Sequence, residues 1–483
     1  MAYACFQDFL ARLDREGELR RIREPVDPVL EIAEVADRVM KQPGGGPALL
    51  FEHPRGHTVP VAINTLGSRR RVSLALGVND VEEIAAEIAE MIRPEPPVGL
   101  AAKLRMVPKL RRLASLPPRT VGGGPCQDRV LMGDAVDLLS LPVLQCWPED
   151  GGRFITLPLV FTHDPASGKR NVGMYRIQIF DRTTAGMHWQ IHKVGAEHHR
   201  RAEERGQPIE VAVALGGDPA ITFSAVAPLP PSIDEMLFAG FLRRKPVELV
   251  RCKTVDVLVP AAAEFVIEGR VDPGERRPEG PFGDHTGFYT PIEPYPVLHV
   301  TAITQRERTV YPTTIVGRPP MEDGWIGKAI ERIFLPLVRL TLPEIVDMNL
   351  PVEGCFHNVA LVSIRKRYPG HAFKVMNGIW GLGQLMFTKM VFVFDEDVDV
   401  QNVAECVWRM GNNLDPERDL LLTRGPVDVL DHGARATGFG SKVGFDCTRK
   451  WREEGYAREW PSEIRMSPEV KARIDALWPR LGL

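Results

Sequence analysis

The sequence predicts a mixed α/β protein built from three successive units and a tail. Residues 1–115 alternate amphipathic helices with short apolar strands, and residues 116–315 are a succession of strands joined by short turns. Residues 316–440 read strand, helix, strand, helix, strand, and residues 441–483 form a polar tail. Many strands with short connections indicate an antiparallel sheet or barrel. Strands that alternate with helices indicate a parallel sheet with right-handed crossovers.

The N-terminal unit opens with a helix whose apolar residues recur at helical spacing. These residues are Phe6, Phe9, Leu10 and Leu13. A second helix is expected over residues 28–41, PALLFEH and VPVAINTLG are predicted strands, and VEEIAAEIAEMI is rich in strong helix formers. Residues 95–125 place a basic helix between proline-rich ends, which we interpret as the connector to the next unit. Its basic face could be merely solvated or could contact a membrane surface.

The central unit begins with ITLPLVFTHDPASGKRNVGMYRIQIFDRTTAGMHWQIH, in which three strands are separated by turns rich in Asp, Gly, Ser and Thr. Further strands are expected in IEVAVALG, VELVRCKTVDVLV, AEFVIEGRV and PVLHVTAITQRERTVYPTTIVG, with helices near 194–205 and 233–243. In the third unit, HNVALVSIRK, KMVFVFDED and RDLLLTRG alternate with two predicted helices. The tail ends in an amphipathic helix with exposed apolar residues, which we expect to dock on another subunit.

Composition excludes several classes. The 60 Lys and Arg nearly balance the 63 Asp and Glu, which argues against a nucleic-acid binder. No run of 18 apolar residues occurs, and the N-terminus lacks the apolar core of a signal peptide, so we expect a cytoplasmic protein. The seven cysteines are scattered without a CxxC pair, which argues against a disulfide scaffold or a cysteine zinc site. The common nucleotide-binding loops, HExxH and GxSxG are also missing.

Two segments of the central unit carry candidate binding residues. If NVGMYRIQ is a regular strand, Asn171, Gly173 and Tyr175 share one face and Met174 and Arg176 the other, which separates Asn171 from Arg176. Both polar residues could equally lie on the surface.

The run GMHWQIH places His188, Gln190 and His192 on one face of a strand and Trp189 on the other. The two histidines and the glutamine could bind a metal, bind phosphate or interact only with one another. Glu235 follows a helix start and, taken alone, would be a solvated residue. Asn, His and Glu together are donors that suit Mn²⁺ or Mg²⁺ better than a metal that prefers thiolates.

The stretch EGPFGDHTGFYT places Glu279 and Asp284 around a turn whose glycines, Gly280 and Gly283, permit unusual backbone angles. A carboxyl group that delivers a proton near pH 7 must have a pKa above the ordinary ~3.9 of Asp, through burial or a neighbouring negative charge. Glu279 could supply that charge to Asp284, and Arg176 could hold Glu279 in place. The alternative is a Gly/Pro loop with two solvated acids.

The sequence resembles the UbiD family of prenylated-FMN-dependent decarboxylases. The resemblance is carried, in consistent order up to residue 451, by PVDPVLEIAEVADR, GPALLFEHP, NVGMYRIQ, EGPFGDHTGFYT, VGRPPMED, LPVEGC and GFGSKVGFDCTRKW. Within the family it looks most similar to the 4-hydroxy-3-polyprenylbenzoate decarboxylase branch of ubiquinone biosynthesis. The resemblance implies a central split β-barrel that binds flavin, flanked by an N-terminal α/β unit and a C-terminal α/β domain. It also implies a homodimer or a hexamer, and a flavin prenyltransferase that supplies the cofactor.

The resemblance further implies residue roles. Prenylated FMN would be held through a divalent metal, usually Mn²⁺, with K⁺ close by. The metal ligands would be Asn171, His192 and Glu235. The cofactor would be lined by Met174, Tyr175, Arg176, His188, Trp189, Gln190, Lys193 and Val194, with Lys389 a further candidate for the phosphate. Arg176 would orient the substrate carboxylate, Asp284 would deliver a proton, and Glu279 would position Arg176 and tune Asp284.

Three alternatives to a polyprenylated 4-hydroxybenzoate substrate stay open at this stage. The same chemistry could act on a naphthoate of menaquinone synthesis, a small phenolic acid or a heteroaromatic acid. A split-barrel flavin reductase would use the fold for a different reaction. A flavin-binding or assembly protein would have a purely structural acid loop.

Overall fold

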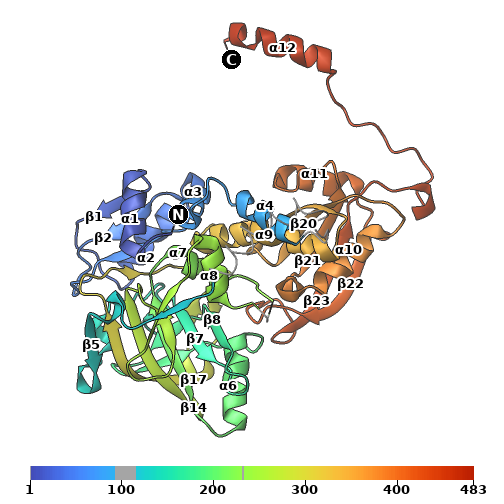
Figure 1. The fold of residues 1–483 in the computed structure, drawn as a ribbon. Helices are drawn as coiled ribbons and strands as arrows, with labels where there is room; N and C mark the ends of the chain where they lie inside the picture. Colours follow the sequence, from blue (N-terminus) through green and yellow to red (C-terminus); the bar gives the residue numbers. More distant parts are fainter. Residues whose placement is uncertain (1, 93–115, 231–232, 483) are drawn as a thin grey trace, which may run out of the picture.

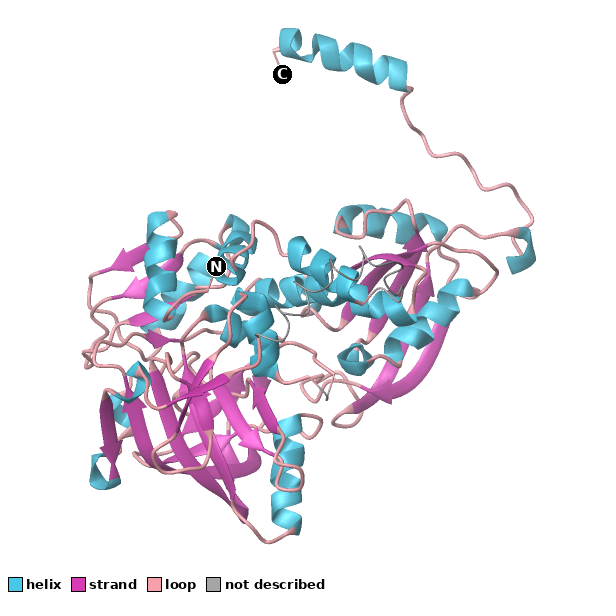
Figure 2. Ribbon diagram, in the orientation of Figure 1, coloured by secondary structure: helices cyan, strands magenta, loops and turns pink. Residues whose placement is uncertain are grey.

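The computed structural model describes residues 2–92, 116–230 and 233–482 (Figure 1). Most of the expected basic connector helix lies outside these residues. Within them the chain forms an N-terminal α/β unit, a central sheet-rich unit and a C-terminal α/β unit, followed by a tail (Figures 1 and 2).

The N-terminal unit packs helices on a small sheet with strand order β1-β2-β3-β18. Its elements are α1 (Phe6–Arg15), β1 (Leu19–Ile22), α2 (Glu31–Met40), β2 (Ala48–Phe51), β3 (Val61–Ile63), α3 (Arg69–Leu76), α4 (Glu82–Met91) and β18 (Tyr311–Pro312). The predicted apolar face of the first helix is confirmed, because Phe6, Phe9, Leu10 and Leu13 are all buried. The fourth strand, β18, comes from residues that follow the central strands, so the N-terminal and central units are tied together.

The central unit is a nine-stranded sheet with order β6-β9-β10-β17-β14-β11-β7-β8, and β5 pairs with β17. All its pairings are antiparallel, as the short connections predict. The strands are β5 (Arg129–Met132), β6 (Phe154–Ile155), β7 (Leu159–His163), β8 (Arg170–Gly173), β9 (Ile177–Ile179), β10 (Thr184–Met187), β11 (Ile209–Leu215), β14 (Phe265–Glu279) and β17 (Glu293–Gln305).

The sheet curls because two short segments join its opposite ends. β8 ends the order at one side and β9 lies next to the other end, yet only residues 174–176 separate them. Residues 156–158 make the same crossing between β6 and β7. Four residue steps span at most about 14 Å, so the two ends must approach each other. They are not hydrogen-bonded along their length, which is the geometry of a split barrel rather than a closed one.

The expected continuous strand through NVGMYRIQ is therefore wrong. The strand breaks after Gly173 and resumes at Ile177, because the chain must leave one end of the sheet and enter the other. Met174, Tyr175 and Arg176 occupy this crossing. Alternation of faces does not apply to them, and their positions are set by the crossing itself.

Helices and small sheets surround the curled sheet. They are β4 (Arg119–Val121), α6 (Val194–Glu204), α7 (Pro219–Ser224), α8 (Glu235–Arg243), β12 (Glu248–Arg251), β13 (Leu258–Pro260), β15 (Phe282–Gly283) and β16 (Tyr289–Thr290). The helices predicted near 194–205 and 233–243 are confirmed as α6 and α8. Asp234 caps α8 by accepting hydrogen bonds from the backbone N–H groups of Met236 and Leu237.

The C-terminal unit is a five-stranded sheet with order β19-β20-β21-β23-β22 and helices on its faces (Figure 2). Its elements are α9 (Glu322–Thr341), β19 (Ile345–Asn349), β20 (Val359–Ile364), α10 (His371–Trp380), β21 (Met390–Asp395), α11 (Val403–Asn413), β22 (Leu420–Pro426) and β23 (Phe439–Asp446). The expected all-parallel sheet is wrong. β20, β21 and β23 are parallel, but RDLLLTRG forms the edge strand β22, which turns back as an antiparallel hairpin partner of β23.

Short 3₁₀ helices occur at Pro43–Gly45, Pro125–Gln127, Gly133–Ala135, Leu138–Ser140, Val352–Gly354, Gly383–Phe387 and Arg452–Glu454.

The tail ends in α12 (Pro468–Leu481), which stands well away from the body at the end of an extended segment (Figure 1). None of its residues is buried, and Trp478 is 51% exposed. The expectation that this helix docks on another subunit stays a prediction.

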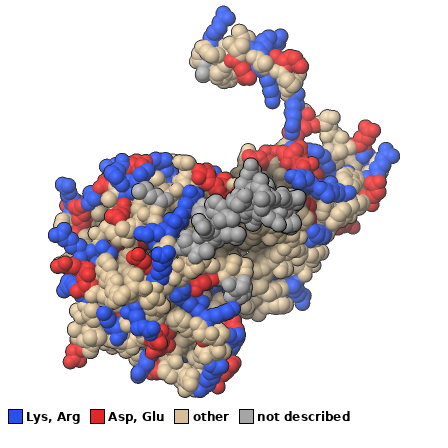
Figure 3. Space-filling model, in the orientation of Figure 1, with Lys and Arg blue, Asp and Glu red and all other residues tan. Residues whose placement is uncertain are grey.

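The surface carries both signs of charge in close alternation on the face shown in Figure 3. Among the described residues, no helix is long and apolar enough to cross a membrane. All seven cysteines are free thiols, and Cys355 alone among them is not buried.

Candidate active site

Arg176 lies between two carboxylates in the interior of the central unit. Its Nε donates to Oε1 of Glu279 at 2.8 Å and its Nη2 donates to Oε2 of Glu279 at 3.0 Å, a bidentate pair. Its Nη1 donates to Oδ2 of Asp284, and Nη2 also donates to Oγ1 of Thr290 at 3.0 Å. The Phe282 ring covers the guanidinium at 4.6 Å. The acid–arginine–acid network expected from sequence is thus formed, and the alternative of two solvated acids is excluded for this loop.

The curled sheet brings these residues together. Arg176 is the last residue of the crossing into β9, Glu279 is the last residue of β14, and Asp284 lies in the hairpin formed by β15 and β16. Asp150 anchors the hairpin, because its Oδ1 accepts a hydrogen bond from the backbone N–H of Gly283 at 2.8 Å. Gln178 Oε1 accepts from the backbone N–H of Gly280 at 2.8 Å.

The two glycines of the loop have different roles. Gly280 has φ of +96°, which a side chain rarely adopts, as expected. Gly283 has no such angle. A Cβ there would lie 2.2 Å from Cδ1 of Trp147, so this position needs a glycine for space and not for backbone freedom. The expectation that both glycines serve the backbone angle is corrected for Gly283.

The electrostatics of the network favour the ionised acids. Burial raises the pKa of Glu279, but hydrogen bonds from His188 and Arg176 outweigh it and leave the pKa below its usual value. Burial likewise opposes ionisation of Asp284, yet His285 and Arg176 hold its pKa well below the usual range. Asp284 is therefore an anion here, contrary to the expectation that Glu279 keeps it neutral. The reason is that the guanidinium contacts Asp284 directly, whereas Glu279 acts on it only from beyond Arg176.

His188 supports the network from the other side. Its Nδ1 lies 3.0 Å from Oε2 of Glu279, and its ring packs on Tyr295 with centroids 4.3 Å apart. The strand expected through GMHWQIH ends at Met187, so residues 188–192 do not alternate between faces. His188 is buried and His192 is exposed.

Sequence reasoning missed a group of polar residues beyond Asp284. His285 Nδ1 lies 3.0 Å from Oδ1 of Asp284, and His285 Nε2 lies 2.8 Å from Nε2 of His357 in the C-terminal unit. Asp323, from α9, also lines the cavity here, and burial of its carboxyl group raises its pKa to about 7. The DHTG sequence after Asp284 was a signal for His285, but nothing local connects it to a histidine 72 residues later.

A cavity of about 580 Å³ opens beside the network between the central and C-terminal units. Its volume is in the range of small-molecule and cofactor sites. Six of the expected cofactor residues line it: Met174, Tyr175, Arg176, His188, Gln190 and Lys193. It is also lined by apolar residues that include Ile326, Ile330, Phe334, Leu337, Leu350 and Leu385.

Three other expected cofactor residues do not line this cavity. Trp189 is buried in the core and its ring packs on His199, with centroids 5.2 Å apart. Val194 is 46% exposed. Lys389 Nζ donates to Oδ1 of Asp431 at 2.9 Å.

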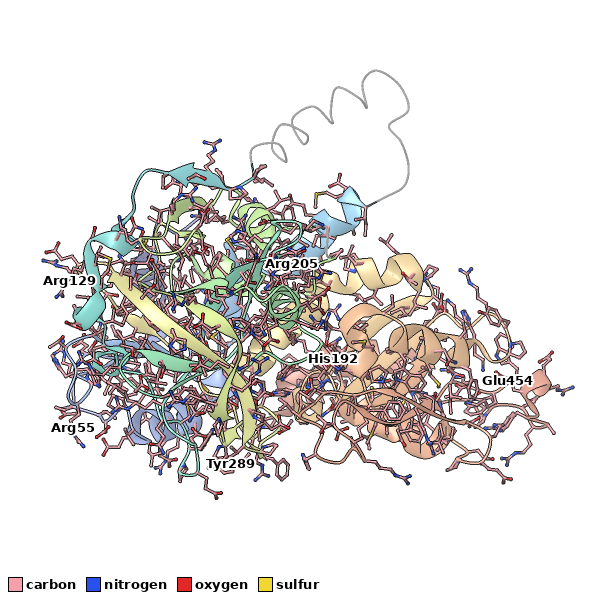
Figure 4. The ribbon with its side chains drawn as sticks, turned by 90° about the horizontal axis from the view of Figure 1, so that it is seen from below. Arg55, Arg129, His192, Arg205, Tyr289 and Glu454 are labelled. Carbon is pink, nitrogen blue, oxygen red and sulfur yellow. The ribbon has the colours of Figure 1, made fainter. Side chains whose placement is uncertain are left out.

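The three expected metal ligands are only partly brought together. Glu235 Oε2 accepts from the backbone N–H of Val172, next to Asn171, at 3.2 Å. Asn171 is buried, and its Nδ2 donates to the hydroxyl of Tyr175 at 3.4 Å. His192 instead packs on Phe387, with ring centroids 5.5 Å apart, and lies at the junction of the central and C-terminal units (Figure 4).

Glu235 is a partly buried carboxyl group beside the strand that carries Asn171. Burial raises its pKa to about 7, and the Asp234 charge adds to the shift. Among the described residues, the only group of three His, Cys, Asp or Glu side chains with ligand atoms within 4.8 Å of one another is Asp272, Glu275 and His299, far from this site in sequence and half-buried.

The split-barrel unit thus holds a buried arginine between two acids beside a large cavity. Comparison with known protein families identifies the family of this chain. Residues 10–91, 119–319 and 324–447 match the N-terminal, Rift-related and C-terminal domains of the family described as 3-octaprenyl-4-hydroxybenzoate carboxy-lyase. The chain belongs to this family, UbiD, and is a carboxy-lyase. The flavin-reductase and non-enzymatic alternatives are not retained.

Its relatives match it from end to end. An uncharacterized protein of Aquifex aeolicus is 53% identical over 482 residues, which cover 100% of this chain and 99% of the relative. One of Archaeoglobus fulgidus is 52% identical over 480 residues, which cover 99% and 98%.

Solved structures that resemble it include a UbiD-class enzyme and an aromatic acid decarboxylase. The enzyme HmfF of Pelotomaculum thermopropionicum, in complex with FMN, has a TM-score of 0.81 and 31% identity over 97% of this chain and 98% of that chain. The vanillic acid decarboxylase of Sedimentibacter hydroxybenzoicus, in its closed form, has a TM-score of 0.86 and 26% identity over 99% of each chain. These structures confirm the predicted fold class.

Proposed function

We propose that this carboxy-lyase removes CO₂ from an aromatic carboxylic acid with prenylated FMN bound in the cavity beside Arg176. The observation that carries the proposal is a buried guanidinium, fixed by Glu279 and Asp284, at the wall of a cavity of about 580 Å³. Support also comes from the UbiD-class enzyme HmfF, one form of which is in complex with prFMN.

The residues of the cavity fit this cofactor. Lys193 is largely buried, which lowers its pKa, and among the described residues it has no hydrogen-bonded carboxylate partner, so it can pair with a phosphate. Nε2 of His188 is buried without a hydrogen-bond partner among those residues, and it lies at the same wall. When bound, the cofactor supplies an electrophilic carbon that accepts the electrons of the breaking bond between ring and carboxylate.

Arg176 orients the substrate carboxylate, and Glu279 holds Arg176 in place by its bidentate pair. A second anion at Arg176 weakens the hold of the guanidinium on Asp284 and places a like charge beside it. Both effects raise the pKa of Asp284, which is the direction that a proton donor requires. After CO₂ departs, Asp284 gives its proton to the ring carbon that lost the carboxylate.

We propose that Asn171 and Glu235, with His192, would hold a divalent cation, Mn²⁺ or Mg²⁺, which would supply positive charge for the cofactor phosphate. The buried carboxylate with a raised pKa and the neighbouring amide oxygen are donors that such a cation prefers. His192 would have to turn from its contact with Phe387 to join them.

We propose 4-hydroxy-3-polyprenylbenzoate, an intermediate of ubiquinone biosynthesis, as the substrate. The apolar extension of the cavity along α9 supports this, because it can take an apolar ring substituent. A small phenolic acid is the second candidate, favoured by the likeness to the vanillic acid decarboxylase. The exposed apolar residues of α12 support a homodimer or hexamer in which the tail of one chain contacts another.

A panel of acids separates the two substrate classes. Purified enzyme, co-expressed with a flavin prenyltransferase, is expected to release CO₂ from prenylated 4-hydroxybenzoates faster than from vanillate, 4-hydroxybenzoate or heteroaromatic acids. The measurement is CO₂ release per enzyme-bound flavin. Turnover of the small acids alone would rule out the quinone-precursor assignment.

Replacement of the proposed proton donor tests the chemistry. Asp284→Asn is expected to lower CO₂ release by about 100-fold or more, because an amide cannot deliver a proton. Flavin content should stay unchanged. The control is Asp134→Asn, at an exposed aspartate in the 3₁₀ helix Gly133–Ala135. Full activity in Asp284→Asn would contradict the assigned role.

The effect of removing the proposed metal ligand is measured as metal and flavin content, without an activity assay. Glu235→Ala is expected to lower the bound flavin and the co-purified divalent metal by about tenfold or more, since loss of even outer-shell partners costs 10–100-fold in metal affinity. Absorbance and elemental analysis measure the two contents. Glu204→Ala, at an exposed position of α6, is the control. Unchanged metal and flavin contents in Glu235→Ala would remove Glu235 from the site.

A further inference from the structure

Three titratable side chains lie in a row that begins at Asp284 and ends in the C-terminal unit. Oδ1 of Asp284 lies 3.0 Å from Nδ1 of His285, and Nε2 of His285 lies 2.8 Å from Nε2 of His357. All three residues line the cavity. Because two ring nitrogens at 2.8 Å must share one hydrogen, one ring donates and the other accepts.

At the far end of the row, one ring nitrogen has no hydrogen-bond partner among the described residues. Nδ1 of His357 is buried without a hydrogen-bond partner among the residues that the structure describes. His357 comes from the segment between the 3₁₀ helix Val352–Gly354 and β20, and it lies at the same cavity wall as Lys193 and Asp428. His357 thus lines the cavity, and its Nδ1 is the ring nitrogen that His285 does not engage.

The reaction needs a route by which a proton reaches Asp284. Loss of CO₂ from a carboxylate followed by protonation of the ring carbon consumes one proton per turnover, so Asp284 must be reprotonated each time. Its carboxylate accepts hydrogen bonds from Arg176, from the backbone N–H of His285 and from the His285 ring. Arginine and the backbone amide do not release protons near neutral pH, which leaves the His285 ring as the donor.

We propose that His357 and His285 form a relay that returns a proton to Asp284 when the next carboxylate binds at Arg176. This inference rests on the proposed function, since it assumes that Asp284 is the proton donor. A proton taken up at Nδ1 of His357 allows its Nε2–H to pass to Nε2 of His285, and Nδ1–H of His285 then passes to Oδ1 of Asp284. Each ring gains one proton at one nitrogen and loses one at the other, so both are neutral in the opposite tautomer when Asp284 is protonated. A turn of each ring or exchange of its proton then restores the starting tautomers before the next cycle.

The charges around the pair suit transfer in this direction. Burial lowers the pKa of His285, but the hydrogen bond and charge of Asp284 more than offset it, with smaller contributions from Asp323 and Asp428, and the pKa is raised. Burial and the His285 charge lower the pKa of His357 to about 4, against Asp428 and Asp431, while Lys193 adds to the lowering. A proton that enters at His357 therefore moves downhill to His285, and its last transfer to Asp284 requires the anion at Arg176 that raises the pKa of Asp284.

The test uses the flavin-loaded enzyme and His357→Gln, which keeps a polar side chain but cannot pass a proton between two nitrogens. We expect kcat for CO₂ release to fall by about tenfold or more, with the 10²–10⁴-fold that acid–base groups typically contribute as the upper range. KM should change little, and the solvent isotope effect on kcat should rise because proton return becomes slow. His432→Gln, at an exposed histidine, is the matched control.

Imidazole separates a relay from a structural role. His357→Ala, at the wall of the cavity, should regain activity in imidazole buffer, whereas its rate in a buffer that cannot enter should stay low. His357→Asn replaces the glutamine variant if the latter does not bind flavin. A kcat within twofold of wild type, or a loss that imidazole does not restore and that leaves the isotope effect unchanged, would overturn the relay. Absence of CO₂ release by the wild-type enzyme would instead overturn the proposed function.

Discussion

The constraint on which the site depends is one guanidinium buried between two carboxylates. The Arg176 side chain is 7% exposed and that of Glu279 is fully buried, so neither charge is stabilised by water. Loss of one partner of such a pair costs about 3–5 kcal/mol because the other charge is left buried and uncompensated. The fold of the central unit keeps these charges paired. It brings together Arg176 from the barrel crossing, Glu279 from the end of β14 and Asp284 from the β15–β16 hairpin.

The site lies between the central and C-terminal units, because the contacts that begin at Asp284 continue into the C-terminal unit. Asp284 extends from the central unit toward His285, and His285 meets His357 of the C-terminal unit. Helix α9, with Asp323 at its start and an apolar face farther along, forms the wall between them. The cavity is thus lined both by polar groups that include Asp284 and His357 and by apolar side chains of α9, a mixture that suits an amphipathic aromatic acid.

The sequence predicted the classes of structure better than their details. The helix at Phe6–Arg15, the antiparallel central strands and the network of Arg176, Glu279 and Asp284 follow from local periodicity, turn residues and the family motif, which are short-range signals. The break between Gly173 and Ile177 was missed because it is imposed by closure of the sheet, which no local pattern encodes. The edge strand Leu420–Pro426 was misplaced because its partner, Phe439–Asp446, comes later in the chain. The His285–His357 contact and the anionic state of Asp284 depend on three-dimensional proximity alone.

The central claim is that Arg176 couples the charge of a bound carboxylate to the protonation of Asp284. Calorimetry of an unreactive aromatic carboxylate, binding to the flavin-loaded enzyme in two neutral buffers of different ionisation enthalpy, tests it directly. The account predicts net uptake of protons on binding, because a second anion at the guanidinium raises the pKa of Asp284. It also predicts that Asp284→Asn abolishes the uptake. Binding without proton uptake, or with the same uptake in Asp284→Asn, would contradict the account.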